Sequence, residues 1–341
     1  MAKCGIPRID QLIAGQDVLA VGNDPQDRAA AGLVQDLLAG QGISGMPGVM
    51  EESHASFGPK TTAAVQQFQQ SKGLPASGKV DAATLKALVD SPATRPTACL
   101  GYLTLVLDFE ATSMLRVMSL TTLFEGAGRF AAFNANTDKA GLSFGLIQWA
   151  QKPLRLNELL RKFQSSQPQA FVNVLADGDA ARAQGLIAHT AKTRGGTNTN
   201  GSTTDPGFDL VKEPWAGRFK KAALDRALQA VQVTAALDAF NASFRQFQNF
   251  APQIKSERGV AFMLDVANQH GDGGAKGIFQ TVNQAEPGLS EPNLLTAIEN
   301  EAVRRVSSQF GVGSNEAKST HNRREAFRTT PLLSDAPFSL G

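Results

Sequence analysis

Two carboxylic acids, Glu125 and Asp138, stand in contrasting surroundings, which is the arrangement that acid–base chemistry needs. Glu125 ends an apolar stretch over residues 112–125, which we expect to be a helix stopped by the glycines that follow. The negative end of the helix dipole and the apolar neighbours both favour the protonated form of this carboxyl group. Asp138 belongs to a polar turn over residues 134–141 and should stay ionised. One protonated and one ionised carboxyl group are what cleavage of a glycosidic bond requires.

Other kinds of catalysis find less support in the chain. The four histidines are scattered without the spacing of metal ligands, and Cys4 and Cys99 are expected to be two unpaired thiols. The nucleophile elbow of a serine hydrolase is missing. We therefore expect no metal and no cofactor. The two carboxylates also have ordinary interpretations, because a Glu at a helix end is usually a surface residue and an Asp in a turn often stabilises that turn.

The elements that must position these acids are mostly helical. After Asp138, residues 142–149 are expected to form a short β-hairpin that leads into a helix. A stretch rich in Gly, Thr and Asn over residues 193–214 is expected to be a long exposed loop. Apolar residues at helical spacing predict helices over residues 112–125, 154–164, 168–175, 180–191, 218–233, 234–249, 256–270, 291–310 and 315–327.

The first 90 residues show a separate helical pattern with a weak internal repeat. Phe57 and Thr61 are four residues apart, as are Val80 and Thr84, and each pair stands at a turn that leads into a helix. Two similar helical half-units would bury a small shared core. Residues 91–100 contain two prolines, which disfavour helix and predict an extended linker. We therefore predict two domains, over residues 1–98 and 99–341.

An ordered series of core, turn and helix-start residues runs through the first domain. It comprises Phe57-Gly58-Pro59-Lys60-Thr61, Ala64-Val65, Phe68-Gln69, Gly73-Leu74, Gly78-Lys79-Val80-Asp81, Thr84 and Leu88. This series resembles the peptidoglycan-binding domain family of three-helix modules. The resemblance implies a non-catalytic module whose partners are the glycan strands of the bacterial cell wall.

Two later stretches carry a second resemblance. Glu125-Gly126 is followed by the polar turn and by Ala140-Gly141-Leu142-Ser143-Phe144-Gly145-Leu146-Ile147-Gln148, and an apolar helix is expected over residues 256–269. This combination resembles the lysozyme superfamily, which includes phage-type and goose-type lysozymes, lytic transglycosylases and chitosanases. The later helix is similar to the central helix of chitosanase-like members. The resemblance implies a mainly α chain, in which a small three-helix wall-binding domain precedes a lysozyme-like α+β domain with a short β-hairpin.

The second resemblance also implies the roles of individual residues. Glu125 would be the general acid, and Asp138 would activate water or stabilise the transition state. The candidate substrate-binding residues are Ser143, Gln148, Trp149, Asp265 and Gln269. Buried hydrogen bonding is the alternative for Asp265 and Gln269, and core packing is the alternative for Trp149. An exposed ion-pairing face is expected for Arg323 and Arg324.

Together the two resemblances predict a peptidoglycan hydrolase that cleaves the β-1,4 glycan backbone with N-acetylmuramidase, or lysozyme, activity. A chitosanase or a lytic transglycosylase is the alternative among enzymes, and the latter would use Glu125 without a second carboxylate. A non-catalytic wall-binding protein is the alternative from a different class. Attachment to the wall-binding module would raise the concentration of the enzyme on its insoluble substrate.

Composition excludes several other classes of protein. The chain of 341 residues has 33 Lys and Arg against 31 Asp and Glu, a balance that argues against a nucleic-acid partner. No apolar run approaches the roughly 18 residues of a membrane-spanning helix, so no membrane insertion is expected. The first residues lack the pattern of a signal peptide. We expect a monomer that acts in the periplasm or cell wall of a bacterium. Phage lysis or a secretion system would deliver it there, as for an endolysin or an injected antibacterial effector.

Overall fold

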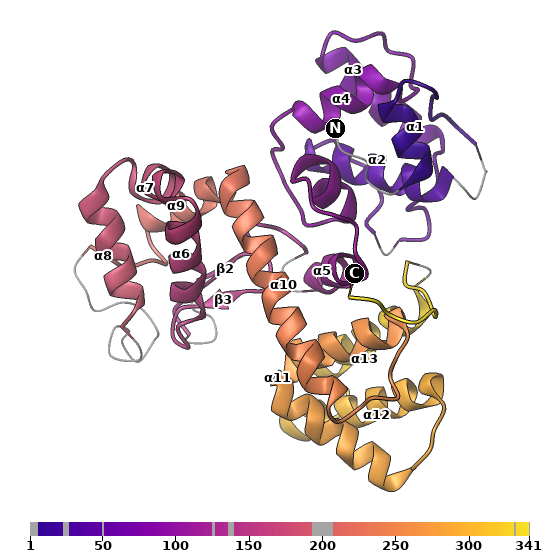
Figure 1. Ribbon diagram of the computed structural model, residues 1–341, viewed down its shortest axis with the longest axis vertical. Coiled ribbons are helices and arrows are strands. Elements are labelled where there is room, and N and C mark those ends of the chain that lie inside the picture. Colours follow the sequence, from indigo (N-terminus) through magenta and orange to yellow (C-terminus); the bar gives the residue numbers. More distant parts are fainter. Residues whose placement is uncertain are drawn as a thin grey trace. The chain divides into compact units, whose positions relative to one another are not determined.

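The computed structural model of the protein describes residues 6–22, 27–49, 51–124, 127–135, 140–192, 207–330 and 332–340. The chain divides into two compact units. The first unit consists of Met1–Ala111 with Glu125–Ala236, and the second consists of Thr112–Phe124 with Leu237–Gly341. Helices dominate both units, and a small three-stranded antiparallel sheet belongs to the first (Figure 1). The predicted mainly α fold class is therefore confirmed, while the predicted domain boundary between residues 98 and 99 stays a prediction.

The described residues at the N-terminal end of the first unit form four helices, one more than predicted. These are α1 (Pro7–Ile13), α2 (Arg28–Gly40), α3 (Pro59–Ser71) and α4 (Ala82–Asp90). Pro59 occupies the first turn of α3, where its missing N–H costs no hydrogen bond. Asp81 caps α4 by accepting a hydrogen bond from the Thr84 N–H at 2.8 Å. The apolar faces of the helices bury a common core that includes Val34, Leu38, Val65, Phe68, Leu85 and Leu88.

The predicted repeat corresponds to two matching hydrogen-bond clusters. The buried side chain of Gln35 on α2 donates to the Thr61 hydroxyl at 2.9 Å and accepts from a loop N–H at 2.8 Å. In the same way, the side chain of Gln69 on α3 donates to the Thr84 hydroxyl at 3.0 Å and accepts from a loop N–H at 2.9 Å. Each glutamine ties the loop after its own helix to the start of the next helix. The loops of this small module thereby satisfy polar groups that would otherwise be buried without partners.

The segment between the two predicted domains is held by backbone hydrogen bonds on both sides. The Thr94 and Arg95 N–H groups donate to the Gly40 carbonyl at 3.0 Å, and the Ala98 N–H donates to the Gly128 carbonyl at 2.7 Å. Cys99 is buried and free, whereas Cys4 lies outside the described residues. A short π-helix, Tyr102–Val106, follows, and the Tyr102 hydroxyl donates to the Gln229 side chain at 2.7 Å.

The sheet consists of β1 (Phe133–Ala135), β2 (Leu142–Phe144) and β3 (Trp149–Ala150), in that order. Strands β2 and β3 form the predicted hairpin, and β1 adds a third strand at its edge. The helices α6 (Arg155–Ser166), α7 (Pro168–Ala176), α8 (Ala180–Thr190) and α9 (Trp215–Ala222) complete this part of the unit, and the first three match the predicted ranges closely. The predicted loop over residues 193–214 lies outside the described residues as far as residue 206.

Helix α10 (Arg226–Gln248) replaces the two helices predicted over residues 218–233 and 234–249. The chain breaks earlier, after α9, where the Asp225 carboxylate accepts hydrogen bonds from the Ala227 and Leu228 N–H groups at 2.8 and 3.3 Å. This cap starts a helix that then continues without interruption. Within the described ranges, no helix combines the length and the apolarity needed to cross a membrane.

The second unit is built from α5 (Ser113–Leu123), the end of α10, α11 (Glu257–Ala285), α12 (Glu291–Phe310) and α13 (Asn315–Thr329). The prediction ends one helix at residue 270, but α11 resumes beyond a break at Gly271. Gly271 has φ 71° and ψ 162°, a conformation that glycine adopts without the steric cost of a Cβ atom. The sequence signal for a helix end was therefore a signal for a kink.

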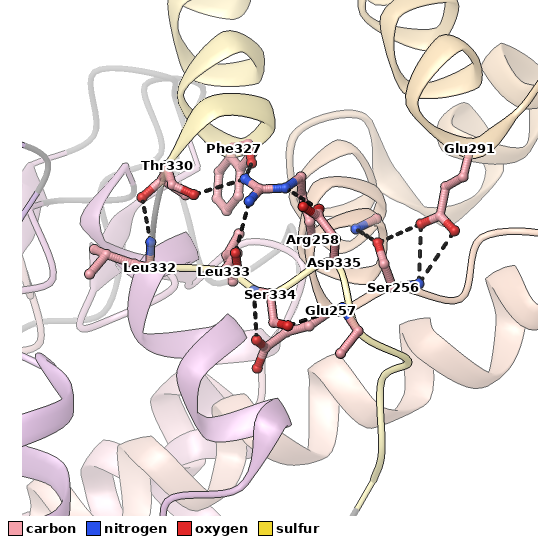
Figure 2. A network of polar contacts seen from close by, with 12 residues as sticks. Ser256, Glu257, Arg258, Glu291, Phe327, Thr330, Leu332, Leu333, Ser334 and Asp335 are labelled. Carbon is pink, nitrogen blue, oxygen red and sulfur yellow. Dashed lines mark hydrogen bonds and ion pairs between the residues drawn. The ribbon is translucent and has the colours of Figure 1, made fainter. Parts of the chain in front are cut away.

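The start of α11 is tied to the C-terminal tail and to α12 (Figure 2). The Ser256 hydroxyl accepts from the Gly259 N–H at 2.9 Å and donates to Glu291 at 2.6 Å. Arg258 pairs with Asp335 at 2.7 Å, and its guanidinium group also donates to three carbonyl groups at the end of α13 and in the tail, those of Phe327, Thr330 and Leu333. These bonds hold the tail against the first turn of α11.

Candidate active site

The two candidate catalytic carboxylates, Glu125 and Asp138, lie outside the described residues. In the sequence, Glu125 directly follows Phe124 at the end of α5, and Asp138 falls between β1 and β2. The Phe124 ring lies 5.3 Å from the Phe327 ring, and the Arg323 guanidinium carbon lies 5.3 Å from the centre of the Phe124 ring. The residue before Glu125 is therefore held by an aromatic and a cationic neighbour, while the catalytic roles of Glu125 and Asp138 stay predictions.

Three of the candidate substrate-binding residues lie in the hairpin formed by β2 and β3. Ser143 is in the central strand β2 and Trp149 begins β3, and these residues are 3% and 4% exposed. The indole of Trp149 therefore belongs to the core, in agreement with core packing as the alternative to substrate binding. Gln148 is half-buried, with φ 52°, and its side-chain amide donates to the Gly145 carbonyl at 3.1 Å. Of these three residues, Gln148 offers the most surface to a ligand.

A buried glutamine on α10, Gln232, fixes the turn that carries Gln148. Its Oε1 accepts from the Leu146 N–H at 3.1 Å, and its Nε2 donates to the Phe130 carbonyl at 3.2 Å. Gly145 has φ 79°, and a Cβ atom there would lie 2.4 Å from the Gln232 Oε1, so glycine alone fits this position. Sequence reasoning missed Gln232. Its signal in the sequence was a polar residue between two valines, in a mostly apolar stretch.

A second buried pair supports the same sheet. Gln151 accepts from the Leu142 N–H at 3.3 Å through its side chain, and its own N–H donates to the Leu142 carbonyl at 2.8 Å. Its Nε2 lies 3.0 Å from the His189 Nε2, and His189 is 2% exposed and stacked on Phe208 at 5.4 Å between ring centres. In the sequence, His189 stands out only as a histidine without the spacing of a metal ligand. Its surroundings are those of a residue that stabilises the sheet.

Asp265 and Gln269 belong to a buried cluster in the second unit. Asp265 is fully buried, and the Arg323 Nε donates to its two oxygens at 2.7 and 2.8 Å. Arg324 pairs with the same carboxylate and donates to the Gln269 Oε1 at 2.5 Å. The Gln269 amide in turn donates to the Thr320 hydroxyl at 3.0 Å. These contacts agree with the alternative role given above for Asp265 and Gln269, which is hydrogen bonding in the interior. A direct contact of either residue with substrate stays a prediction.

The two arginines of this cluster are themselves buried. Arg323 and Arg324 are 8% and 0% exposed, so the predicted exposed ion-pairing face is wrong for both. They face Asp265 because α13 packs against α11. Asp265 accepts from one guanidinium group and pairs with the other, and such close pairing offsets the cost of burying these charges. Through the contact of Arg323 with Phe124, this cluster reaches the end of α5.

His270 lies at the break of α11, directly before Gly271. Burial lowers its pKa, and the positive charges of Arg305 and Arg323 lower it further, so the neutral imidazole is favoured. Its Nε2 is buried and has no hydrogen-bond partner among the described residues. His270 was not among the candidate residues, although it stands at the predicted end of a helix, directly before a glycine. In the described part of the chain, no group of three or more His, Cys, Asp or Glu side chains is arranged to hold a metal ion.

Comparison with known proteins identifies the first helical module. Residues 28–88, which include α2, α3 and α4, match the protein family described as "Putative peptidoglycan binding domain". This match confirms the predicted resemblance of that segment.

Among solved structures, the chain is similar to a native chitosanase from Bacillus subtilis MY002, with 15% identity and a TM-score of 0.44 over 64% of this chain and 88% of that chain. A mutant of a chitosanase from the same source, complexed with 6 GlcN, gives a TM-score of 0.45 at the same identity and coverage. No curated protein sequence matches this chain.

Proposed function

We propose that the protein is a cell-wall hydrolase that cleaves the β-1,4 glycan backbone of peptidoglycan, with the activity of an N-acetylmuramidase. The observation that carries this proposal is the peptidoglycan-binding match over residues 28–88, which links the chain to a wall polymer. The contrasting sequence surroundings of Glu125 and Asp138 support glycosidic cleavage as the reaction. The enzyme acts in the bacterial cell wall, to which phage lysis or a secretion system delivers it.

In the proposed reaction, Glu125 donates its proton to the glycosidic oxygen while the bond between that oxygen and the anomeric carbon breaks. Asp138 takes a proton from the attacking water, or stabilises the positive charge that develops on the sugar ring. Water supplies the hydroxyl group of the new reducing end. Proton exchange with solvent then restores both carboxyl groups for the next cycle.

The other candidate site residues would support the two carboxylates in different ways. Gln148 is the candidate for direct contact with the glycan, because Ser143 and Trp149 are nearly covered in the free protein. Ser143 and Trp149 would shape the sheet beneath the substrate. Asp265 and Gln269 act as positioning residues, because they hold the arginines of α13, one of which lies over the ring that precedes Glu125.

The test is digestion of purified cell walls by the full chain. The protein should lower the turbidity of a wall suspension and release soluble glycan fragments whose ends mass spectrometry can identify. Reducing-end muramic acid supports the proposal, whereas 1,6-anhydro ends would mean a lytic transglycosylase. Cleavage of chitosan alone would mean a chitosanase. Sedimentation of the protein with walls that it does not cleave would mean a non-catalytic wall-binding protein.

A further inference from the structure

The segment that carries the sheet has an excess of positive charge that the rest of the chain does not share. Residues 125–236 contain 14 Lys and Arg against 9 Asp and Glu, a net charge of +5, while the whole chain has a net charge of +2. The remaining residues are therefore net acidic. A local excess of one sign attracts ligands of the opposite sign and repels ligands of the same sign.

Part of this charge is presented by α9, which is anchored to the sheet. The Phe219 ring of α9 packs edge-on against the Phe144 ring of β2, with 5.0 Å between their centres. Phe219 is fully buried, so the contact fixes the helix beside the strand. Lys220 is the next residue, and its ammonium nitrogen lies 5.1 Å from the centre of the Phe133 ring on β1. The edge strand of the sheet therefore carries a positive charge over one of its aromatic side chains.

Lys220 differs from Lys212 and Arg218 in lacking an acidic partner among the described residues. Lys212 pairs with Asp209 at 3.0 Å, and Arg218 pairs with Asp177 at 2.9 Å. Within the described part of the chain, no carboxylate pairs with Lys220, and its side chain is exposed. An ammonium group held over a ring keeps its charge and its three donors available to a ligand. In the sequence, the same edge strand leads into the turn that contains Asp138.

We propose that Lys220 is a specificity-determining residue that binds a carboxylate substituent of the glycan. It would thereby favour an acidic polymer, such as peptidoglycan, over neutral glycans and over polymers that carry amino groups. The proposal rests on the proposed function, and it adds the chemical feature by which the sheet-bearing segment selects its substrate. Attraction of a carboxylate to this ammonium group lowers KM, and repulsion of an amine raises it.

The test compares two variants on two forms of one substrate. Lys220→Gln removes the charge in question, and Lys221→Gln removes an equal charge at the next residue of α9, which is also exposed. The probes are soluble glycan fragments of purified peptidoglycan and the same fragments after conversion of their carboxyl groups to amides. At low salt, Lys220→Gln should raise KM for the acidic fragments roughly two- to fivefold with kcat unchanged, the range for one exposed ion pair. KM for the amidated fragments should not change, and Lys221→Gln should resemble the unmodified protein.

Calorimetric titration of the same fragments, with the same variants, separates this inference from the proposed function. If the chain cleaves the acidic fragments but Lys220→Gln leaves KM unchanged, the inference is wrong and the hydrolase stands. An equal loss in both variants would mean that overall charge, rather than Lys220, attracts the substrate. Binding that depends on Lys220 and on the carboxyl groups, without any cleavage, would retain the inference and refute the hydrolase. Absence of both binding and cleavage would refute both.

Discussion

Asp265 lies in a buried charge cluster, where it faces two arginines of α13. Asp265→Asn keeps the shape of the side chain and removes its negative charge. Asp265 is 0% exposed, and its partners Arg323 and Arg324 are 8% and 0% exposed. The variant would remove the carboxylate that both buried guanidinium groups face. Removal of one partner from a buried ion pair costs about 3–5 kcal/mol, because the remaining charge has lost its solvation and its partner.

The expected loss is large for a unit of this size. The second unit comprises Thr112–Phe124 and Leu237–Gly341, which is the size of a small domain. For such a domain, 1 kcal/mol shifts the unfolding midpoint by roughly 3–6 °C, so a loss of about 3–5 kcal/mol in Asp265→Asn should lower it by about 9–30 °C. Circular dichroism at increasing temperature, together with urea titration at the same pH, measures both quantities.

A surface pair provides the matched control for this experiment. Asp335 pairs with Arg258 at 2.7 Å, but the Asp335 side chain is 80% exposed, so Asp335→Asn should cost less than about 1 kcal/mol. Replacing Asp265, Arg323 and Arg324 together by apolar residues of similar volume should recover much of the loss, because the charges of the cluster would be removed together. If Asp265→Asn were as stable as Asp335→Asn, the two arginines would not depend on this carboxylate and the reasoning would be refuted.

Four further predictions concern the site and the wall-binding module. Glu125→Gln should lower the rate of wall lysis by roughly 10²–10⁴-fold, as loss of a general acid does. The control Glu110→Gln, at an exposed position just before α5, should keep the normal rate. If Glu125→Gln kept more than about a tenth of the normal rate, the assignment of Glu125 as the general acid would be contradicted. Asp138→Asn should lower activity by orders of magnitude at an unchanged melting temperature, and a normal rate would place the base elsewhere. Residues 1–98 alone should sediment with purified peptidoglycan without lowering its turbidity, and failure to sediment would argue against a self-sufficient module. Gly145→Ala should cost about 1–3 kcal/mol in urea unfolding, because the positive φ and the close glutamine amide both resist a Cβ atom; an unchanged midpoint would mean that the amide can move away.

Local patterns in the sequence were sufficient for most of the helices and for the wall-binding module. Turn chemistry and helical spacing around Pro59 and Asp81 predicted α3 and α4, and the repeated helix starts at Thr61 and Thr84 correspond to real hydrogen-bond clusters. Such features depend on residues a few positions apart, so they can be seen without the fold. The errors also had local causes. The break before α10 follows the cap at Asp225 rather than the apolar period, and a glycine inside a helix can kink it as well as end it.

The sequence by itself determined the mainly α class, the β-hairpin, the module that matches the peptidoglycan-binding family, and the pair of acids around which a hydrolase can be proposed. Only the tertiary structure decided which polar residues serve the interior. Gln232 lies 87 residues beyond Gly145 in the chain, and Arg323 lies 58 residues beyond Asp265, so no local pattern could reveal that these residues meet. Their partners are set by which helix faces pack together. On a surface, these polar and charged side chains would be hydrated by water. In the interior they must pair with one another, and this pairing favours one arrangement of the chain.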